Sequence, residues 1–217
     1  CVGASLAIVA AENDRIGKDV AYIYAMAPYF DLRTLGPAVF SSQQKVKGVW
    51  SPWFPERYDR VRGIFQNALL QALPPPDAEA IQEALIRQDY IATDDLTSLS
   101  PDGKVVVRIL STRSPEELEQ LFASFSKPMQ ERLLYLSPAG RIENLTALLF
   151  LAYGYDGYLP FSEDEAFLTA NIKEFYPVQF SSFNHVTPIF DELTLQEKIQ
   201  ETVKLWLHTW RFMTVAT

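Results

Sequence analysis

The chain has 217 residues, of which 48% are hydrophobic and 21% charged, and its formal net charge is −8. This composition is typical of a globular domain and excludes a long disordered chain or a fibrous repeat. An acidic chain without clustered Lys and Arg argues against a nucleic-acid partner, because neutralising a phosphate backbone needs such clusters.

Cysteine and histidine are both scarce in this chain. The single cysteine, Cys1, excludes an intrachain disulfide and a cysteine-type metal centre, and the two histidines, His185 and His208, lie far apart in sequence. We therefore expect no metal and no cofactor. No apolar run approaches the ~20 residues that cross a bilayer, so no membrane partner is expected. A lone reduced cysteine favours the cytoplasm.

The first part of the chain, residues 1–32, is predicted to contain a helix and then a strand. Small and apolar residues fill positions 1–11, and Gly17 lies in the segment that ends this helix. Residues 20–27 form a nearly continuous apolar run, the pattern of a strand covered on both faces, and Pro28 ends it. A helix followed directly by a buried strand favours an α/β architecture with parallel strands.

The middle part, residues 33–141, is richer in charge and proline and is predicted to be mostly helical. Helices are expected over residues 58–72, 78–87 and 104–110, and from a Ser114 cap onward. The run over 104–110 also fits a strand, but its helical neighbours favour a helix. The aromatic residues here are predicted to be core residues or the edge of a lid; they are Trp50, Trp53 and Phe54.

The last part, residues 142–217, returns to alternating strands and helices. The predicted elements are a buried strand over 145–153, a helix over 162–172 with a capping box at Ser162, a strand over 177–183, and a final helix capped by Thr194. The final helix carries an apolar stripe, the pattern of a helix packed against a core. Its residues are Leu195, Ile199, Val203, Trp206 and Trp210.

Two polar residues follow predicted strands, where α/β sheets hold their sites. Asp156 follows the strand over 145–153, and His185 follows the strand over 177–183. If the two loops lie side by side, Asp156 accepts a hydrogen bond from His185 and fixes its tautomer. Taken singly, an Asp after a strand is usually a turn residue and a lone His is usually structural, as we expect for His208.

Three short stretches resemble the α/β-hydrolase family, in particular its lid-bearing esterase or peptidase-like members. They are the Asp-x-x-Leu-Pro stretch at 156–160, the Phe-x-His-Val-x-Pro stretch at 183–188, and the opening Cys-Val-Gly-Ala-Ser-Leu-Ala at 1–7. The resemblance implies the C-terminal half of a hydrolase sheet with an inserted helical lid. Residues 1–32 and 142–217 would form the hydrolase core, and residues 33–141 the lid.

The same resemblance implies a role for each residue. Cys1 would occupy the nucleophile position, as in dienelactone-hydrolase-like members, with His185 as base and Asp156 as the acid that orients it. The backbone N–H of Val2 would supply an oxyanion donor. The expected activity is hydrolysis of a small carboxylic ester or related acyl bond. Ser5 is a rival nucleophile, disfavoured because it lies one helical turn further on.

Other functions remain open at this stage. A catalytically inactive, hydrolase-like binding or scaffold module would keep the fold without the chemistry. Alternatively, Cys1 could be the lipidated first residue of a lipoprotein. The family's strands that precede the nucleophile are not in this sequence. We therefore expect the N-terminal half of the sheet as a partner, either in the same gene product or as a separate chain.

Overall fold

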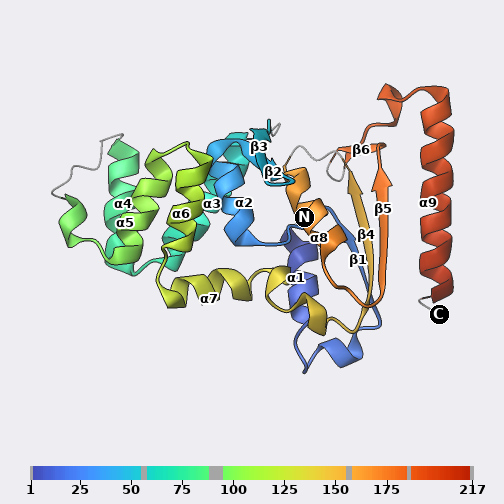
Figure 1. Ribbon diagram of the computed structural model, residues 1–217, viewed down its shortest axis with the longest axis horizontal. Coiled ribbons are helices and arrows are strands. Elements are labelled where there is room, and N and C mark those ends of the chain that lie inside the picture. The colour runs from blue at the N-terminus through green and yellow to red at the C-terminus, as the bar shows by residue number, and fades with distance from the viewer. Residues whose placement is uncertain (1, 55–57, 88–94, 155–157, 185–186, 216–217) are drawn as a thin grey trace. The chain divides into compact units, whose positions relative to one another are not determined.

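The chain divides into two units (Figure 1). The computed structural model describes residues 2–54, 58–87, 95–154, 158–184 and 187–215. One unit comprises residues 1–32 and 134–217, and the other comprises residues 33–133. The boundary between residues 133 and 134 lies inside the helix that leads back to the first unit.

The first unit contains a parallel sheet of three strands, so the expected mixed α/β class is confirmed. The strand order is β1 (Tyr22–Met26), β4 (Leu148–Gly154) and β5 (Phe175–Phe180). Both neighbouring pairs are parallel. The remaining elements of this unit are α1 (Val2–Ala11), α8 (Phe161–Thr169), the short strands β6 (Phe183–Asn184) and β7 (Thr187–Pro188), and α9 (Leu195–Val215).

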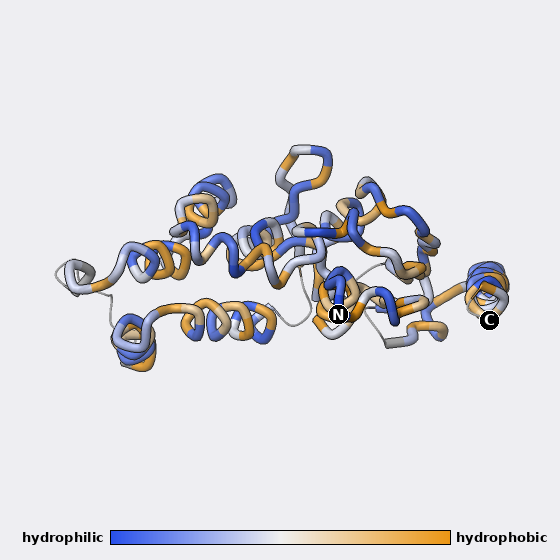
Figure 2. The backbone as a smooth tube through the Cα atoms, turned by 90° about the horizontal axis from the view of Figure 1, so that it is seen from below, coloured by the Kyte–Doolittle hydropathy of each residue, from blue (hydrophilic) through white to orange (hydrophobic). Residues whose placement is uncertain are grey.

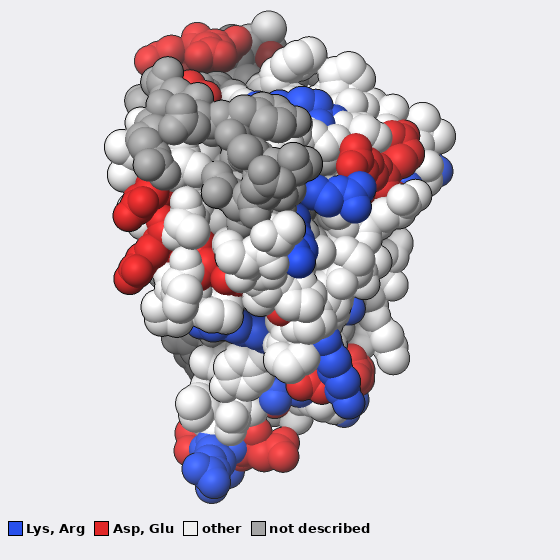
Figure 3. All heavy atoms as spheres, turned by 90° about the vertical axis from the view of Figure 1, so that its left-hand side faces the viewer, with Lys and Arg blue, Asp and Glu red and all other residues white. Residues whose placement is uncertain are grey.

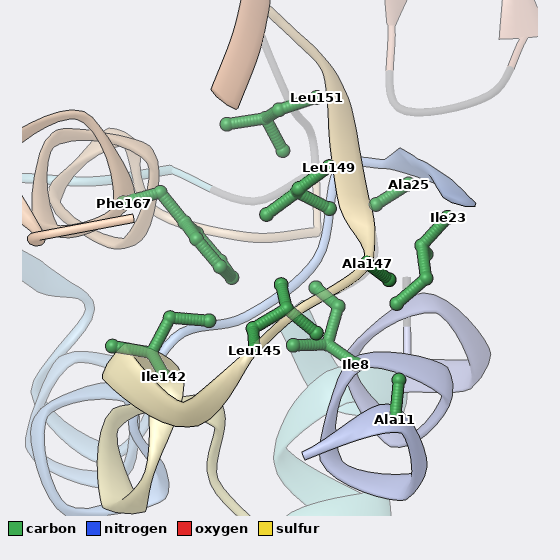
Figure 4. Packing of buried hydrophobic residues seen from close by; sticks show 10 residues of the cluster. All are labelled: Ile8, Ala11, Ile23, Ala25, Ile142, Leu145, Ala147, Leu149, Leu151 and Phe167. Carbon is green, nitrogen blue, oxygen red and sulfur yellow. The ribbon is translucent and has the colours of Figure 1, made fainter. Parts of the chain in front are cut away.

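One face of the sheet is covered by α1 and α8. Alternate residues of the strands point to this face because side chains alternate along a strand. They form the main apolar cluster with the two helices and the chain leading into β4 (Figure 4). Its members are Ile8, Ala11, Ile23, Ala25, Ile142, Leu145, Ala147, Leu149, Leu151 and Phe167. From α1, Ile8 and Ala11 belong to this cluster.

The opposite face of the sheet is covered by α9 (Figures 1 and 2). His208 of α9 lies in edge-on contact with Tyr24 and Phe150, with ring centroids 5.4 and 5.6 Å apart. Phe212, one turn later, packs edge-on against Tyr22 and Tyr24 of β1. His208 is buried, and burial lowers its pKa below the ordinary value, with Arg211 adding to the effect. Its position agrees with a structural role.

The apolar stripe of α9 is exposed rather than packed against the core. Thr194 caps the helix as predicted: its side chain accepts from the Glu197 N–H, and the Glu197 carboxylate accepts from the Thr194 N–H. The sheet, however, receives a different side of the helix, which includes Glu201, His208 and Phe212. The stripe therefore faces solvent, with 50 to 76% of each residue exposed. Its exposed residues are Leu195, Ile199, Val203, Trp206, Trp210 and Met213.

Glu12, directly after α1, is a buried carboxyl group without a hydrogen-bond partner among the described residues. It is 4% exposed, and neither of its oxygens has a partner. Burial raises its pKa from 4.5 to about 8; the nearby Arg141 opposes this rise and Glu143 adds to it. The C-terminal end of a helix also carries partial negative charge, which disfavours a carboxylate. Glu12 therefore prefers its protonated form in the folded protein.

The second unit is mainly helical, with one antiparallel hairpin. Its elements are α2 (Leu32–Ser41), β2 (Gln43–Val46), β3 (Val49–Pro52), α3 (Tyr58–Ala72), α4 (Pro75–Arg87), α5 (Pro101–Ser111), α6 (Pro115–Ala123) and α7 (Lys127–Tyr135). The helices predicted over 58–72, 78–87 and 104–110 are confirmed. So is the Ser114 cap, whose hydroxyl accepts from the Glu117 N–H. Sequence analysis did not anticipate the hairpin.

Aromatic residues of the second unit divide between core and surface. Phe40 and Phe122 are almost fully buried and pack against each other, with centroids 6.4 Å apart. Trp53 is buried as the core prediction requires, whereas Phe54 is 79% exposed, so that prediction is wrong for Phe54.

On the face drawn in Figure 3, Lys and Arg side chains are dispersed among acidic ones and form no continuous basic area.

Candidate functional site

The carboxyl ends of the three parallel strands lie together at one edge of the sheet. Met26 of β1 pairs with Ala152 of β4, and Gly154 of β4 pairs with Phe180 of β5. Ala27, directly after β1, donates its N–H to the Ala152 carbonyl at 3.0 Å and adopts a left-handed φ of 44°. Ligand sites of α/β sheets lie beyond the carboxyl ends of the strands, so this edge is the candidate site.

Gly154 allows the ends of β4 and β5 to approach closely. A Cβ atom at this position would overlap the carbonyl oxygen of Phe180. Any residue other than glycine would push the two strand ends apart. The chain segments that carry the two predicted polar residues therefore depart from neighbouring points on this edge.

The predicted triad residues Cys1, Asp156 and His185 all lie outside the described residues, and the triad stays a prediction. The described parts of the chain fix the points from which these residues depart. Asp156 is the second residue after the end of β4, and His185 is the first residue after β6. Cys1 directly precedes α1. The question is whether these three departure points lie at the same edge.

The first turn of α1 lies beside the carboxyl end of β1. The Ser5 hydroxyl donates to the carbonyl of Tyr29, three residues after β1, at 2.9 Å. Val2, from which an oxyanion N–H is predicted, is the first residue of α1, and N–H groups of a first turn have no acceptor within the helix. Ser5 itself is fully buried, so its hydroxyl cannot reach a substrate, which argues against it as the nucleophile.

Glu163 connects the first turn of α8 to the same edge. Its Oε2 accepts from the backbone N–H groups of Phe30 and Asp31, at 2.8 and 2.9 Å. The predicted capping box at Ser162 is wrong, because α8 begins one residue earlier, with Pro160 at the N-cap. Sequence analysis missed this role of Glu163, since its partners lie more than 130 residues away in sequence.

Tyr29 fixes the chain between β1 and the second unit. Its side chain is 3% exposed, and its hydroxyl donates to the Leu136 carbonyl at 2.8 Å. Burial and the negative charge of Glu163 raise the pKa of Tyr29 to about 12, so the phenol stays protonated near neutral pH. Nearby, the Leu32 N–H donates to Ser137 Oγ at 2.9 Å. These groups hold backbone in place; they are not oriented as acids or bases for a substrate.

Glu201 of α9 anchors the chain that leaves β5. Its Oε2 accepts from the N–H groups of Ser181 and Ser182 and from the Ser182 hydroxyl, and Lys204 Nζ lies 2.6 Å from Oε1. Burial alone would raise the pKa of Glu201, but these hydrogen bonds and the Lys204 charge outweigh it and lower the pKa. Glu201 thereby fixes the segment that leads into β6 and, directly after it, His185.

At this edge, buried polar side chains of the described residues hold backbone segments in place. Ser5 and Glu163, for example, bind backbone groups of neighbouring segments. Among the described residues, no group of His, Cys, Asp and Glu side chains could hold a metal ion. The sequence-predicted residues Cys1, Asp156 and His185 remain the candidates for the chemistry at this edge.

Comparisons with family models, with curated proteins and with solved structures found no match for this chain. Among its described residues, no helix combines the length and apolar character needed to span a bilayer. Functional inference therefore rests on the sequence motifs and on the geometry of the sheet edge.

Proposed function

We propose that the chain is an α/β-hydrolase-like enzyme, or part of one, that cleaves a small carboxylic ester or related acyl bond. Cys1 acts as nucleophile, His185 as general base and then general acid, and Asp156 as the acid that orients His185. The backbone N–H of Val2 contributes to the oxyanion site. The inserted helical segment, residues 33–141, corresponds in this proposal to the lid of the lid-bearing members.

One observation carries this proposal: the chain segments next to all three triad residues begin or end at one edge of the sheet. Gly154 and Phe180 bring the ends of β4 and β5 together, and the Ser5–Tyr29 hydrogen bond brings the start of α1 to the end of β1. The element order helix, strand, insertion, strand, helix, strand, helix also agrees with the C-terminal half of a hydrolase core.

The proposed reaction proceeds in two balanced halves. His185 takes the proton of the Cys1 thiol, and the thiolate attacks the ester carbonyl to form a tetrahedral oxyanion. Collapse of this intermediate breaks the ester bond; His185 protonates the departing alcohol, and a thioester remains on Cys1. A water molecule, deprotonated by His185, then hydrolyses the thioester, releases the carboxylic acid and restores the thiol.

The edge of the sheet at β1 supports a partner. In the described sheet β1 is an edge strand, and its residues Tyr22 and Tyr24 remain 40 and 37% exposed. An unpaired strand edge presents free N–H and C=O groups to another strand. We propose that the N-terminal half of a hydrolase sheet pairs here, whether it belongs to the same gene product or to a separate chain.

Ester turnover by histidine variants of the full-length protein tests the triad. We expect His185→Ala to lower kcat for a p-nitrophenyl ester by at least about 100-fold, because both proton transfers lose their carrier. His208→Gln is the matched control, since His208 lies on the α9 face of the sheet, and it should retain turnover. Unchanged turnover in His185→Ala would refute the triad.

A second measurement separates the enzyme from the binding module. Alkylation of Cys1 should abolish turnover, and Asp156→Asn should lower kcat without abolishing thiol alkylation. If the folded full-length protein shows no turnover of acyl esters or thioesters yet binds them, the catalytically inactive hydrolase-like module is the better description.

A further inference from the structure

The outward side of α9 carries a continuous apolar seam. Its residues from position 199 onward are spaced by four, three, four and three residues, the spacing of a helix that pairs with another helix. They are Ile199, Val203, Trp206, Trp210 and Met213, which we call the α9 seam. Each is at least 50% exposed, and the rings of Trp206 and Trp210 stack with centroids 6.4 Å apart.

The α9 seam lies on the side of the helix away from the sheet. The sheet-facing side includes Glu201, His208 and Phe212, which bind or pack against the strands and the chain after β5. At 100° per residue, the seam lies roughly opposite these positions. In Figures 1 and 2, α9 forms an outer layer of its unit.

None of the five residues of the seam is charged. Most residues beside it are uncharged as well, among them Gln200, Thr202, Leu207 and Thr209, and Lys198 is the charged residue beside Ile199. Three charged residues of α9 are engaged elsewhere: Glu201 and Lys204 bind the chain around the end of β5, and Arg211 lies over the Tyr176 ring at 5.0 Å. Two copies of a chain with net charge −8 repel each other in general, but they can meet through a neutral face without like-charge repulsion.

The area of the seam is adequate for a homodimer. Two half-exposed tryptophans with three further half-exposed apolar side chains offer roughly 500 to 600 Å² on each copy, since one aromatic side chain buries ~150–250 Å². The flanking residues bring this close to the ~800 Å² per partner of a standard interface. Exposed tryptophans are also the side chains that most often dominate binding energy at the centre of an interface.

We propose that two copies of this chain associate through the α9 seam, about a two-fold axis that crosses the helix near its middle. An antiparallel pair of seams brings Ile199 opposite Trp210, and Val203 opposite Trp206. The same patch then serves both partners, as an isologous interface requires. This inference does not depend on the proposed hydrolase activity, because the seam lies on the opposite face of the sheet from α1 and α8.

Sedimentation velocity of the full-length protein tests the proposal, with circular dichroism as the check on folding. We expect the wild-type protein to sediment at twice the monomer mass. The variant Trp206→Glu/Trp210→Glu should weaken dimerisation by at least about 100-fold while keeping the wild-type spectrum. Phe54→Glu, which changes an even more exposed aromatic residue outside the seam, is the control and should remain dimeric.

Three outcomes would overturn the proposal. If the wild-type protein stays monomeric at 100 μM, the seam is either covered by another part of the same molecule or exposed to solvent without a partner. A double variant that still dimerises shows that another surface forms the interface. If the double variant unfolds, the milder Trp210→Gln variant decides, since it should raise the dissociation constant by about tenfold; an unchanged constant refutes the seam.

Discussion

The buried carboxyl of Glu12 gives the sharpest test of the energetics of the fold. We expect Glu12→Gln to stabilise the protein at alkaline pH. Glutamine has nearly the same shape and cannot ionise, so the variant removes only the cost of a buried negative charge. Glu12 is 4% exposed, and neither of its oxygens has a partner among the described residues.

The magnitude follows from the pKa of Glu12, which is about 8 in the folded protein against 4.5 ordinarily. Because the folded protein holds a proton that the unfolded chain has lost, stability is highest below pH 4.5 and falls as pH rises toward 8. At 1.36 kcal/mol for each pH unit between the two values, the ceiling is about 5 kcal/mol. Water penetration reduces this ceiling further, and we expect about 2 kcal/mol.

Thermal unfolding at pH 5 and pH 9 measures this effect. At pH 9 the Tm of Glu12→Gln should exceed that of the wild type by about 4–8 °C, whereas at pH 5 the two should nearly agree. Glu174→Gln, which changes an exposed carboxylate, is the control, and its difference from wild type should not vary between the two pH values. A Tm difference for Glu12→Gln that is the same at pH 5 and pH 9 would refute the reasoning.

Two further predictions concern α8. Phe167→Ala should lower the free energy of unfolding, measured in urea, by about 3–5 kcal/mol, because Phe167 is fully buried in the main apolar cluster. The neighbouring residue Leu168 is 37% exposed, so Leu168→Ala should lower it by less than about 1.5 kcal/mol. Equal losses in the two variants would contradict this packing. Glu163→Gln should cost about 1–3 kcal/mol through weakened bonds from Phe30 and Asp31. Glu165→Gln should be nearly neutral in the same titration, and a matching loss there would show that the two backbone bonds are not the cause.

Elements set by local patterns could be predicted from the sequence. The Ser114 and Thr194 caps depend on residues three positions away, and both form as predicted. The apolar runs also predicted the strands β1 and β4. β4, the central strand, is buried on both faces as such a run implies, whereas Tyr22 and Tyr24 of the edge strand β1 stay partly exposed. For the same reason the α/β class was predictable. Even the run over 104–110, which fits a strand as well as a helix, is decided by its helical neighbours.

Features set by distant contacts could not be predicted in this way. Glu163 resembles a capping-box residue in sequence, but its partners come from the chain after β1. Glu201 appears as an ordinary surface residue of a helix until the loop after β5 is folded onto it. Likewise, the stripe of α9 resembles a core-facing stripe, because periodicity shows that a helix has an apolar side but not what covers it. The residues of the candidate triad were identified from motifs, and the described structure adds only the positions of the neighbouring segments at the sheet edge.

The chain enters and leaves the second unit through two segments that are joined to each other. Leu32 binds Ser137, Phe30 accepts from the Ala139 N–H, and the Tyr29 hydroxyl reaches Leu136. All three hydrogen bonds lie within the first unit, and they hold the two chain segments together where the second unit is inserted. The inserted segment can therefore be lengthened, replaced or deleted, in evolution or by protein engineering, without removing the hydrogen bonds that hold the first unit together at this point.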